Sequence, residues 1–283
     1  GVADLLDVDH HDIRLDVVSY RPTERAVVRV TSGAGETLSY LKVVAPGETL
    51  SIAARHDALV TAGVPAPKVT ASDHLMGVLV LEPLIGPTLR ELIKSGDDGW
   101  VGAEEFDRLA DRFGRARLDG APLPSRLTDG ALHARMLGTV VPKLRGQLDE
   151  LIARFGVAVV PAADSTIHGD LHEAQLVVRD ATIVGVLDID DAGPGAAIDD
   201  RANLIARLLF RSTLDTTGRP ELAEYAHRIR SNSRARFDPA QLDLHTSAAL
   251  VGLATGPFRV QGNNWRAEVS ALVERASMRE LSA

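Results

Sequence analysis

The densest group of ionisable side chains lies between residues 168 and 191, in the segments HGDLHEAQ and LDIDD. Its members are His168, Asp170, His172, Glu173, Gln175, Asp188, Asp190 and Asp191. Carboxylates that are held together near apolar strands repel one another and lose hydration unless a cation neutralises them. Carboxylate and amide oxygens, together with substrate phosphates, are the ligands that Mg²⁺ prefers. The cluster therefore predicts a divalent metal site.

The order of these residues resembles the catalytic segment of the aminoglycoside phosphotransferase and choline kinase family, whose members are small-molecule relatives of the protein kinases. The family pattern is His-Gly-Asp, an Asn five positions after the Asp, and a metal-binding Asp at the end of the next strand. Asp170, Gln175 and Asp188 occupy these three positions. The resemblance implies that Asp170 accepts or orients the proton of a substrate hydroxyl, and that Gln175 and Asp188 hold Mg²⁺ against the phosphates of ATP. Glutamine departs from the pattern, because its extra methylene group moves the amide oxygen by about 1.5 Å.

The resemblance extends toward the N-terminus. Lys42, in SYLKVV, stands on the third predicted strand, where the family places the lysine that pairs with nucleotide phosphates. Glu82 and Leu84, in the segment EPL, match the hinge whose backbone groups bind adenine. The helix position that carries a glutamate partner for the lysine in relatives holds an alanine here. Asp57, one turn later on the same predicted face, is the substitute that we expect.

The elements that must position these residues change in kind near residue 85. Before it, short runs rich in Val, Leu, Tyr and Thr predict strands, at 15–20, 25–32, 37–44, 68–72 and 77–81, with one helix over 49–62. After it, helical patterns dominate, at 88–95, 103–117, 131–155, 201–211, 219–237 and 239–255, with a small hairpin within 176–187. With the resemblance, this predicts an α+β, protein-kinase-like bilobal fold. Residues 1–84 form a small antiparallel sheet lobe with one helix, and residues 85–283 form a larger, mainly helical lobe.

Several positions keep two interpretations. His168 is expected to brace the catalytic loop, and the role of His172 stays open. Asp190 either binds a second Mg²⁺ or a water, or is a loop carboxylate held by backbone amides. Asp199 and Asp200 precede a predicted helix and are expected to cap it. Residues 250–265, LVGLATGPFRVQGNNW, predict a loop with an aromatic surface that either walls the substrate pocket or closes the core.

The composition limits the partners. The chain has 283 residues, with 31 Lys and Arg against 39 Asp and Glu and a net charge of −8, which disfavours binding to nucleic acid or to an anionic membrane. It has no cysteine, which excludes disulfides and thiol nucleophiles and favours an intracellular, cytoplasmic protein. Glu173, Asp191 and the acidic balance favour a cationic acceptor, such as an aminoglycoside-like antibiotic, an amino sugar or an amino alcohol.

Three functions follow. The leading one is an ATP- and Mg²⁺-dependent kinase that phosphorylates a hydroxyl group of a small molecule by direct in-line transfer, with Asp170 as base. The second is a metal-dependent hydrolase in which His168, Asp170 and His172 alternate on one strand face, with Asp188 as a further ligand. The third is a kinase-shaped nucleotide-binding protein without turnover, suggested by Gln175 and by the missing helix glutamate.

Overall fold

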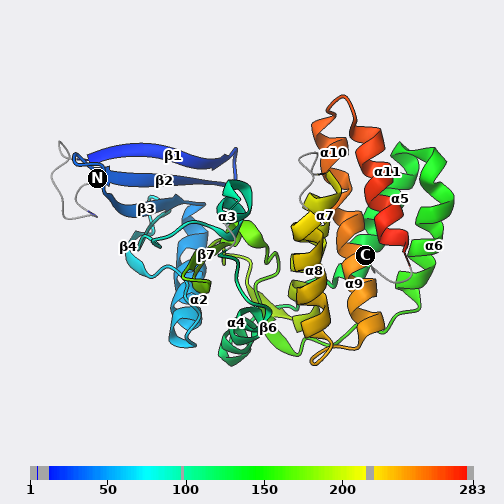
Figure 1. Ribbon diagram of the computed structural model, residues 1–283. Helices are drawn as coiled ribbons and strands as arrows, with labels where there is room; N and C mark the ends of the chain where they lie inside the picture. Colours follow the sequence, from blue (N-terminus) through cyan, green and yellow to red (C-terminus); the bar gives the residue numbers. More distant parts are fainter. Residues whose placement is uncertain (1–4, 6–12, 97–98, 215–219, 279–283) are drawn as a thin grey trace.

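The computed structural model describes residue 5 and residues 13–96, 99–214 and 220–278. Its N-terminal part is a five-stranded antiparallel sheet in the order β1-β2-β3-β5-β4 (Figure 1). The strands are β1 (Ile13–Arg21), β2 (Arg25–Ser32), β3 (Thr37–Val43), β4 (Val69–Asp73) and β5 (Val78–Leu81). These bounds confirm the five predicted strands to within a few residues.

The pleat of the sheet decides which residues face the rest of the protein. Successive side chains of a strand point to opposite faces, and paired residues of neighbouring strands share a face. Lys42 pairs with Leu79 on β5 and with Val27 on β2, so these three share one face. Arg25 lies two residues before Val27 on the same strand and joins them. Leu79 packs with Ile52 of the helix α2 (Thr49–Thr61), so this is the face that the helix covers.

Helix α2 has a different buried face from the one that the sequence suggested. Its buried residues are Thr49, Ile52, His56 and Leu59, whereas Leu50 and Asp57 are exposed. The observed spacing of three to four residues is that of a helical stripe. The sequence placed Asp57 on the inner face of this helix. The observed inner face is shifted by about one residue along the chain, so it contains His56 rather than Asp57.

The C-terminal part is mainly helical (Figure 1). Its α-helices are α3 (Leu89–Ser95), α4 (Ala103–Arg115), α5 (Arg126–Val140), α6 (Arg145–Gly156), α7 (Ala197–Leu214), α8 (Pro220–Ser233), α9 (Pro239–Leu253), α10 (Thr255–Val260) and α11 (Trp265–Ser277). The single helix expected over 131–155 is therefore wrong. Pro142 begins a short 3-10 turn between α5 and α6, because proline lacks the N–H that a continuous helix requires.

The segment 250–265 is also not a loop. It completes α9 and forms α10, and the two aromatic rings of Phe258 and Trp265 pack together with centroids 5.5 Å apart. Trp265 is buried in the large core that unites the helices. Leu253, Thr255 and Arg259 of the same segment line a cavity. That this cavity is the substrate pocket stays a prediction.

Small β elements inside the helical part carry the chemistry-bearing segment. Strand β6 (Ser165–Ile167) pairs with β9 (Gly193–Gly195), and β7 (Leu176–Arg179) pairs with β8 (Thr182–Val186) as the predicted hairpin. The hairpin is tied to two segments of the preceding chain. The Val178 N–H donates to the Pro87 carbonyl, between β5 and α3, and the Val186 N–H donates to the Pro65 carbonyl, between α2 and β4. Leu84 packs against Gly185 at the same junction.

The division of the chain follows these elements. The sheet ends at Leu81 and α3 begins at Leu89, so the expected boundary after residue 84 falls in the connection between them. The position of the boundary stays a prediction. Within the described ranges, none of the helices combines the length and the apolar character that a bilayer crossing requires.

Candidate active site

The catalytic-type loop His168-Gly169-Asp170 leaves β6 and is fixed by a buried carboxylate. Asp200, in the first turn of α7, accepts the His168 N–H at 2.6 Å and the Gly169 N–H at 2.9 Å. Gly169 has a φ of +88°, a backbone conformation that glycine adopts without strain. Burial raises the pKa of Asp200. The expected capping role of Asp200 is therefore wrong, because its carboxylate holds this loop.

Asp199 also has a different role from the expected cap. Its Oδ1 accepts the Arg126 N–H at the start of α5 and contacts His245 Nδ1 at 2.6 Å. Arg126 in turn donates from its guanidinium to the Gly169 carbonyl. The loop is thus held between α5 and α7.

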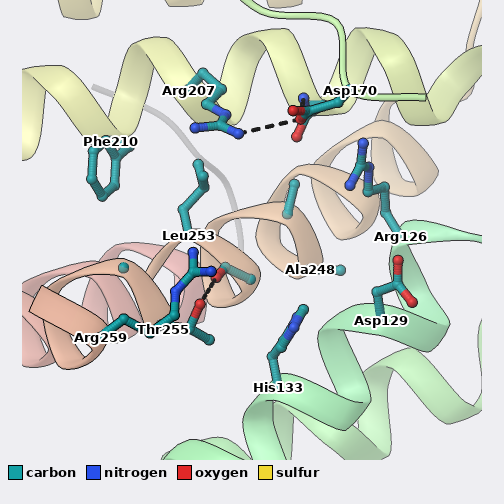
Figure 2. Close-up of a pocket in the computed structure, with 14 residues that line it drawn as sticks. Arg126, Asp129, His133, Asp170, Arg207, Phe210, Ala248, Leu253, Thr255 and Arg259 are labelled. Carbon is teal, nitrogen blue, oxygen red and sulfur yellow. Dashed lines mark hydrogen bonds and ion pairs between the residues drawn. The ribbon is translucent and has the colours of Figure 1, made fainter. Parts of the chain in front are cut away.

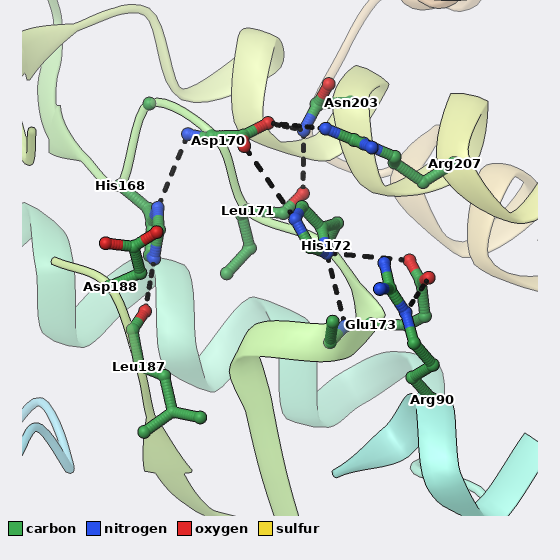
Figure 3. Close-up of polar contacts among 12 residues, drawn as sticks. Arg90, His168, Asp170, Leu171, His172, Glu173, Leu187, Asp188, Asn203 and Arg207 are labelled. Carbon is green, nitrogen blue, oxygen red and sulfur yellow. Dashed lines mark hydrogen bonds and ion pairs between the residues drawn. The ribbon is translucent and has the colours of Figure 1, made fainter. Parts of the chain in front are cut away.

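Asp170 points out of this loop toward α7 (Figure 3). Its Oδ1 accepts from Asn203 Nδ2 at 3.1 Å and from Arg207 Nη2 at 3.2 Å, and its side chain is 50% exposed. His172 Nε2 lies 3.7 Å from Oδ2, beyond hydrogen-bond reach. Burial raises the pKa of Asp170, but the charges of Arg207 and its neighbours more than offset this and lower it. The carboxylate is therefore ionised at neutral pH and accessible.

Both ring nitrogens of His168 contact backbone groups. Nε2 lies 2.9 Å from the Leu187 carbonyl, and Nδ1 accepts the Asp170 N–H at 3.3 Å. The side chain is buried, as its expected bracing role requires. His172 Nδ1 accepts the Ala174 N–H, and burial together with Arg207 lowers the pKa of His172 to about 4. His172 is therefore a neutral loop residue at pH 7. His168, Asp170 and His172 are not gathered as the three-ligand hydrolase arrangement requires.

Gln175 and Asp188 are joined through the backbone of Leu187. The Leu187 N–H donates to the Gln175 carbonyl at 2.8 Å, while the Leu187 carbonyl lies 2.9 Å from His168 Nε2. Figure 3 shows Asp188 next to this junction. Asp188 has a φ of +56°, a left-handed conformation that Asp tolerates better than most residues. The Oε1 atom of Gln175 is buried and has no hydrogen-bond partner among the described residues.

Arg25, on β2, reaches across to Asp188. Its Nη1 lies 2.7 Å from Asp188 Oδ1 and its Nη2 lies 2.8 Å from Oδ2, and Nη1 also lies 3.2 Å from Asp190 Oδ2. Burial lowers the pKa of Arg25, but Asp188 and Asp190 raise it on balance. Both oxygens of the expected metal ligand are therefore engaged by a guanidinium from the sheet.

Asp190 is the partner of Lys42. Lys42 Nζ lies 2.5 Å from Asp190 Oδ2, and the lysine is 4% exposed. His56 Nδ1 contacts the Pro67 carbonyl at 2.7 Å, which leaves its Nε2 facing Asp190 Oδ1 at 3.7 Å. Burial raises the pKa of Asp190, but His56 and Lys42 lower it well below its usual range. The expected partner, Asp57, is wrong because its side of α2 faces solvent.

The hinge candidates lie at the end of β5. The Glu82 N–H donates to the Lys68 carbonyl, whereas neither the Glu82 carbonyl nor the Leu84 N–H has a backbone partner within the described part of the chain. Leu84 packs on Gly185 of the hairpin. These two free backbone groups and one apolar side chain are the features that an adenine base would use.

Glu173 lies inside the protein and lines neither of the two cavities described below. Its carboxylate is 0% exposed and pairs with Arg90 Nε at 3.0 Å and with Arg211 Nε. Burial raises the pKa of Glu173, but Arg211 and Arg90 lower it on balance. Glu173 thus offers no free negative charge to an acceptor, contrary to the expectation.

Replacing Glu173 by Gln is expected to lower the free energy of unfolding by about 3 kcal/mol, because it leaves two arginines without their buried counter-charge. Because its pKa is lower in the folded protein than in the unfolded chain, this stability is present at neutral pH and is lost as the pH falls below the ordinary value of 4.5. Urea unfolding at pH 7 and pH 4 measures both effects. Glu150→Gln, on the exposed side of α6, is the control. A loss below 1 kcal/mol at pH 7 would contradict the prediction.

Two cavities adjoin these groups. One, of about 330 Å³, is lined by residues of α5, α7, α9 and α10 and has Asp170 on its wall (Figure 2). The other, of about 690 Å³, lies between the turn 21–24, α2 and the segment 190–194. The turn at residues 21–24, which has no glycine, therefore lines a cavity whose wall also includes Arg25 and Asp190. Asp191 lies on the wall of this cavity and not on that of the cavity beside Asp170.

Sequence reasoning missed several residues of this site. They are Arg25, His56, Arg126, Asn203 and Arg207. Asn203 and Arg207 lie one turn apart on α7, and this spacing of four puts them on one helix face. That spacing is the one sequence signal that could have grouped two of them.

Comparison with known proteins gives consistent results. Residues 20–245 match the model of a phosphotransferase enzyme family. A search of curated proteins finds no significant match. Aminoglycoside phosphotransferase APH(4)-Ia, solved as a ternary complex with ADP and hygromycin B, is 14% identical with a TM-score of 0.66, over 100% of this chain and 98% of that one.

Two further solved structures have the same fold. Amicoumacin kinase hAmiN, in complex with AMP-PNP, Ca²⁺ and Ami, is 13% identical with a TM-score of 0.63, over 95% of this chain and 89% of that one. Macrolide 2'-phosphotransferase MphH from Brachybacterium faecium is 18% identical with a TM-score of 0.56, over 95% and 98%. At these identities the similarity concerns the fold alone.

Proposed function

Because the chain belongs to the phosphotransferase enzyme family, we propose that it transfers the terminal phosphoryl group of ATP to a hydroxyl group of a small molecule, with Asp170 as the base. One observation carries the proposal. Contacts of the described residues tie the loop of Asp170, the segment of Gln175 and Asp188, and Lys42 of the sheet into a single connected site.

The transfer needs little covalent chemistry from the protein. The acceptor oxygen bonds to the γ-phosphorus, the bond from that phosphorus to the bridging oxygen of ADP breaks, and the hydroxyl proton passes to Asp170 and then to solvent. Asn203 and Arg207 hold Oδ1 of Asp170, which leaves Oδ2 to receive the hydroxyl. The lowered pKa makes Asp170 a weak base, so its main effect is to orient the hydroxyl.

A divalent cation fits the residues present. Gln175 offers a buried amide oxygen without a hydrogen-bond partner among the described residues, and Asp188 offers a carboxylate that is 34% exposed. These oxygens would hold Mg²⁺, which neutralises phosphate charge when it is bound. Arg25 occupies both oxygens of Asp188 and must release at least one of them.

The protein offers groups that complement both the base and the phosphates of a nucleotide. We propose that adenine bonds the free backbone groups of Glu82 and Leu84, and that the phosphates lie beside Lys42. The related structures with ADP or AMP-PNP support a nucleoside triphosphate as the donor. A cytoplasmic location, where ATP is available, agrees with this proposal.

The acceptor is proposed to carry an amine. The relatives bound to hygromycin B and to amicoumacin are consistent with an antibiotic-like acceptor. In this chain the support comes from Asp129, which lines the cavity beside Asp170 and whose carboxylate has no hydrogen bond or ion pair within the described residues. A free carboxylate at this place suits an ammonium group.

A screen for acceptor-dependent ADP release tests the proposal. Aminoglycosides, amino sugars, choline-like alcohols and neutral sugars are each added to the enzyme with MgATP, and Asp170→Asn is the blank. ADP release that needs an acceptor and is lost in the blank supports the kinase. Nucleotide binding without ADP release for any acceptor favours the protein without turnover, for which the engagement of Asp188 by Arg25 is the supporting observation.

A further inference from the structure

The cavity beside Asp170 is rich in guanidinium groups. Arg126 on α5, Arg207 on α7 and Arg259 on α10 line it, and the two carboxylates on its wall are Asp129 and Asp170 (Figure 2). Arginines are thus supplied by three separate helices to a space of about 330 Å³, which is the size of a small metabolite rather than of a large antibiotic.

Two of these arginines have structural partners. Arg126 donates to the Gly169 carbonyl, and Arg207 donates from Nη2 to Asp170. Each guanidinium has five N–H donors, so these contacts leave donors unused. The Nε atom of Arg207 is buried without a partner among the described residues.

Arg259 has no structural partner at all in the described part of the chain. It is exposed, and neither a hydrogen bond nor an ion pair engages its guanidinium. Figure 2 shows the guanidinium beside Leu253 and Thr255, on the cavity wall. A free guanidinium on the wall of a cavity is a group that binds carboxylates and phosphates in a bidentate manner.

The balance of charge in the cavity favours an anion. Asp170 is already paired with Arg207, so the free charges are the guanidinium of Arg259, the remaining charge of Arg126 and the carboxylate of Asp129. An acceptor whose charged groups are all amines would satisfy Asp129 but would leave the arginines unpaired and would be repelled by them.

We propose that the acceptor carries, besides its hydroxyl group, an anionic group that Arg259 binds, either a carboxylate or a phosphate ester. This proposal rests on the proposed function, since it specifies the acceptor of that reaction. A sugar acid or a sugar phosphate has the required anion, and a zwitterion has in addition the amine proposed for Asp129.

A set of hexose derivatives that differ in charge tests the proposal. The probes are gluconate, glucose 6-phosphate, glucose and glucosamine, and their dissociation constants are measured by calorimetry with MgADP present. We expect gluconate or glucose 6-phosphate to bind at least tenfold more tightly than glucose and glucosamine. Which of the two anions binds better identifies the carboxylate or the phosphate ester as the group recognised.

Variants assign the effect to the arginine. Arg259→Gln is expected to weaken binding of the preferred anion by about 10- to 100-fold, the loss of one charge-assisted hydrogen-bonded pair. Arg259→Lys should restore part of it, because it keeps the charge but not the bidentate geometry. Arg135→Gln, an exposed position of α5 outside the cavity lining, is the matched control and should change nothing.

The outcomes separate this inference from the proposed function. If neither anion binds more tightly than glucose and glucosamine, or if Arg259→Gln leaves anion binding unchanged, the inference is overturned, whatever ADP release shows. If the anions bind through Arg259 but no acceptor releases ADP, the anion site stands and the proposed reaction fails.

Discussion

Replacing Asp170 by Asn is expected to lower kcat for phosphoryl transfer by about 10²- to 10⁴-fold. The variant removes the group that receives the hydroxyl proton but keeps an oxygen at the same position. Asn203 and Arg207 can still donate to that oxygen, so the loop and the helix α7 should keep their arrangement. Arg207 loses its counter-charge but is partly exposed, which limits the cost in stability.

The measurement separates chemistry from binding. ADP release gives kcat, while the rise in melting temperature with the Mg²⁺ complex of a non-hydrolysable ATP analogue reports nucleotide binding. We expect kcat to fall and the thermal shift to stay within the error of wild type. Asp149→Asn, on the exposed side of α6, makes the same chemical change away from the site. An Asp170→Asn variant with more than a tenth of the wild-type kcat would contradict the role of base.

The parts of the site that the sequence predicted are local in the chain. Asp170, Gln175 and Asp188 lie within one loop and one hairpin, so their spacing carries the geometry that a short motif can encode. Lys42 was identified because it stands on the third predicted strand, where the resembling family places the lysine that pairs with nucleotide phosphates. The antiparallel sheet and the mainly helical second part also follow from periodicity, which is a local signal.

The parts that the sequence did not predict depend on contacts between distant segments. Arg25 reaches Asp190 across 165 positions of sequence, and no local pattern marks it. The partner of Lys42 was sought on α2, but it is Asp190, 148 positions away along the chain. The buried face of α2 was also placed about one residue out of phase. A helix advances by 100° per residue, so such an error exchanges Asp57 for His56 on the inner side.

The charge of the cavity beside Asp170 also could not be read from composition. The net charge of −8 describes the whole chain, whereas the pocket is set by which side chains the helices α5, α7 and α10 bring together. Glu173 seemed to make the site acidic, but Arg90 and Arg211 neutralise it inside the protein. The local field at a site depends on such pairing more than on the total charge.

Replacing Asp190 by Asn is expected to lower kcat/KM for ATP by about 10²-fold, because Lys42 loses the carboxylate that holds its ammonium group in place. In protein-kinase-like relatives a helix glutamate has this role. Here the partner lies two residues after Asp188, so the lysine is positioned by the segment that follows β8. The free energy of unfolding should fall by about 3 kcal/mol, since the ammonium is buried.

A double-mutant cycle with Lys42→Met tests this pairing. The double variant should be more stable than Asp190→Asn alone, because methionine removes the unpaired charge while it fills a similar volume. Its ATP kinetics should stay as low as those of Lys42→Met. This difference separates a positioning role from general damage to the fold, and it can be measured by urea unfolding even where the single variant is too unstable for kinetics.

The matched control for this cycle is Asp57→Asn, on the exposed side of the helix that carries His56. It should change the free energy of unfolding by less than about 0.5 kcal/mol and leave kcat/KM for ATP unaltered. If Asp57→Asn instead reproduces the loss, or if Asp190→Asn keeps kcat/KM for ATP within twofold of wild type, then Lys42 is not positioned by Asp190. In that case the nucleotide would have to draw the lysine away from the carboxylate with which it pairs in this structure.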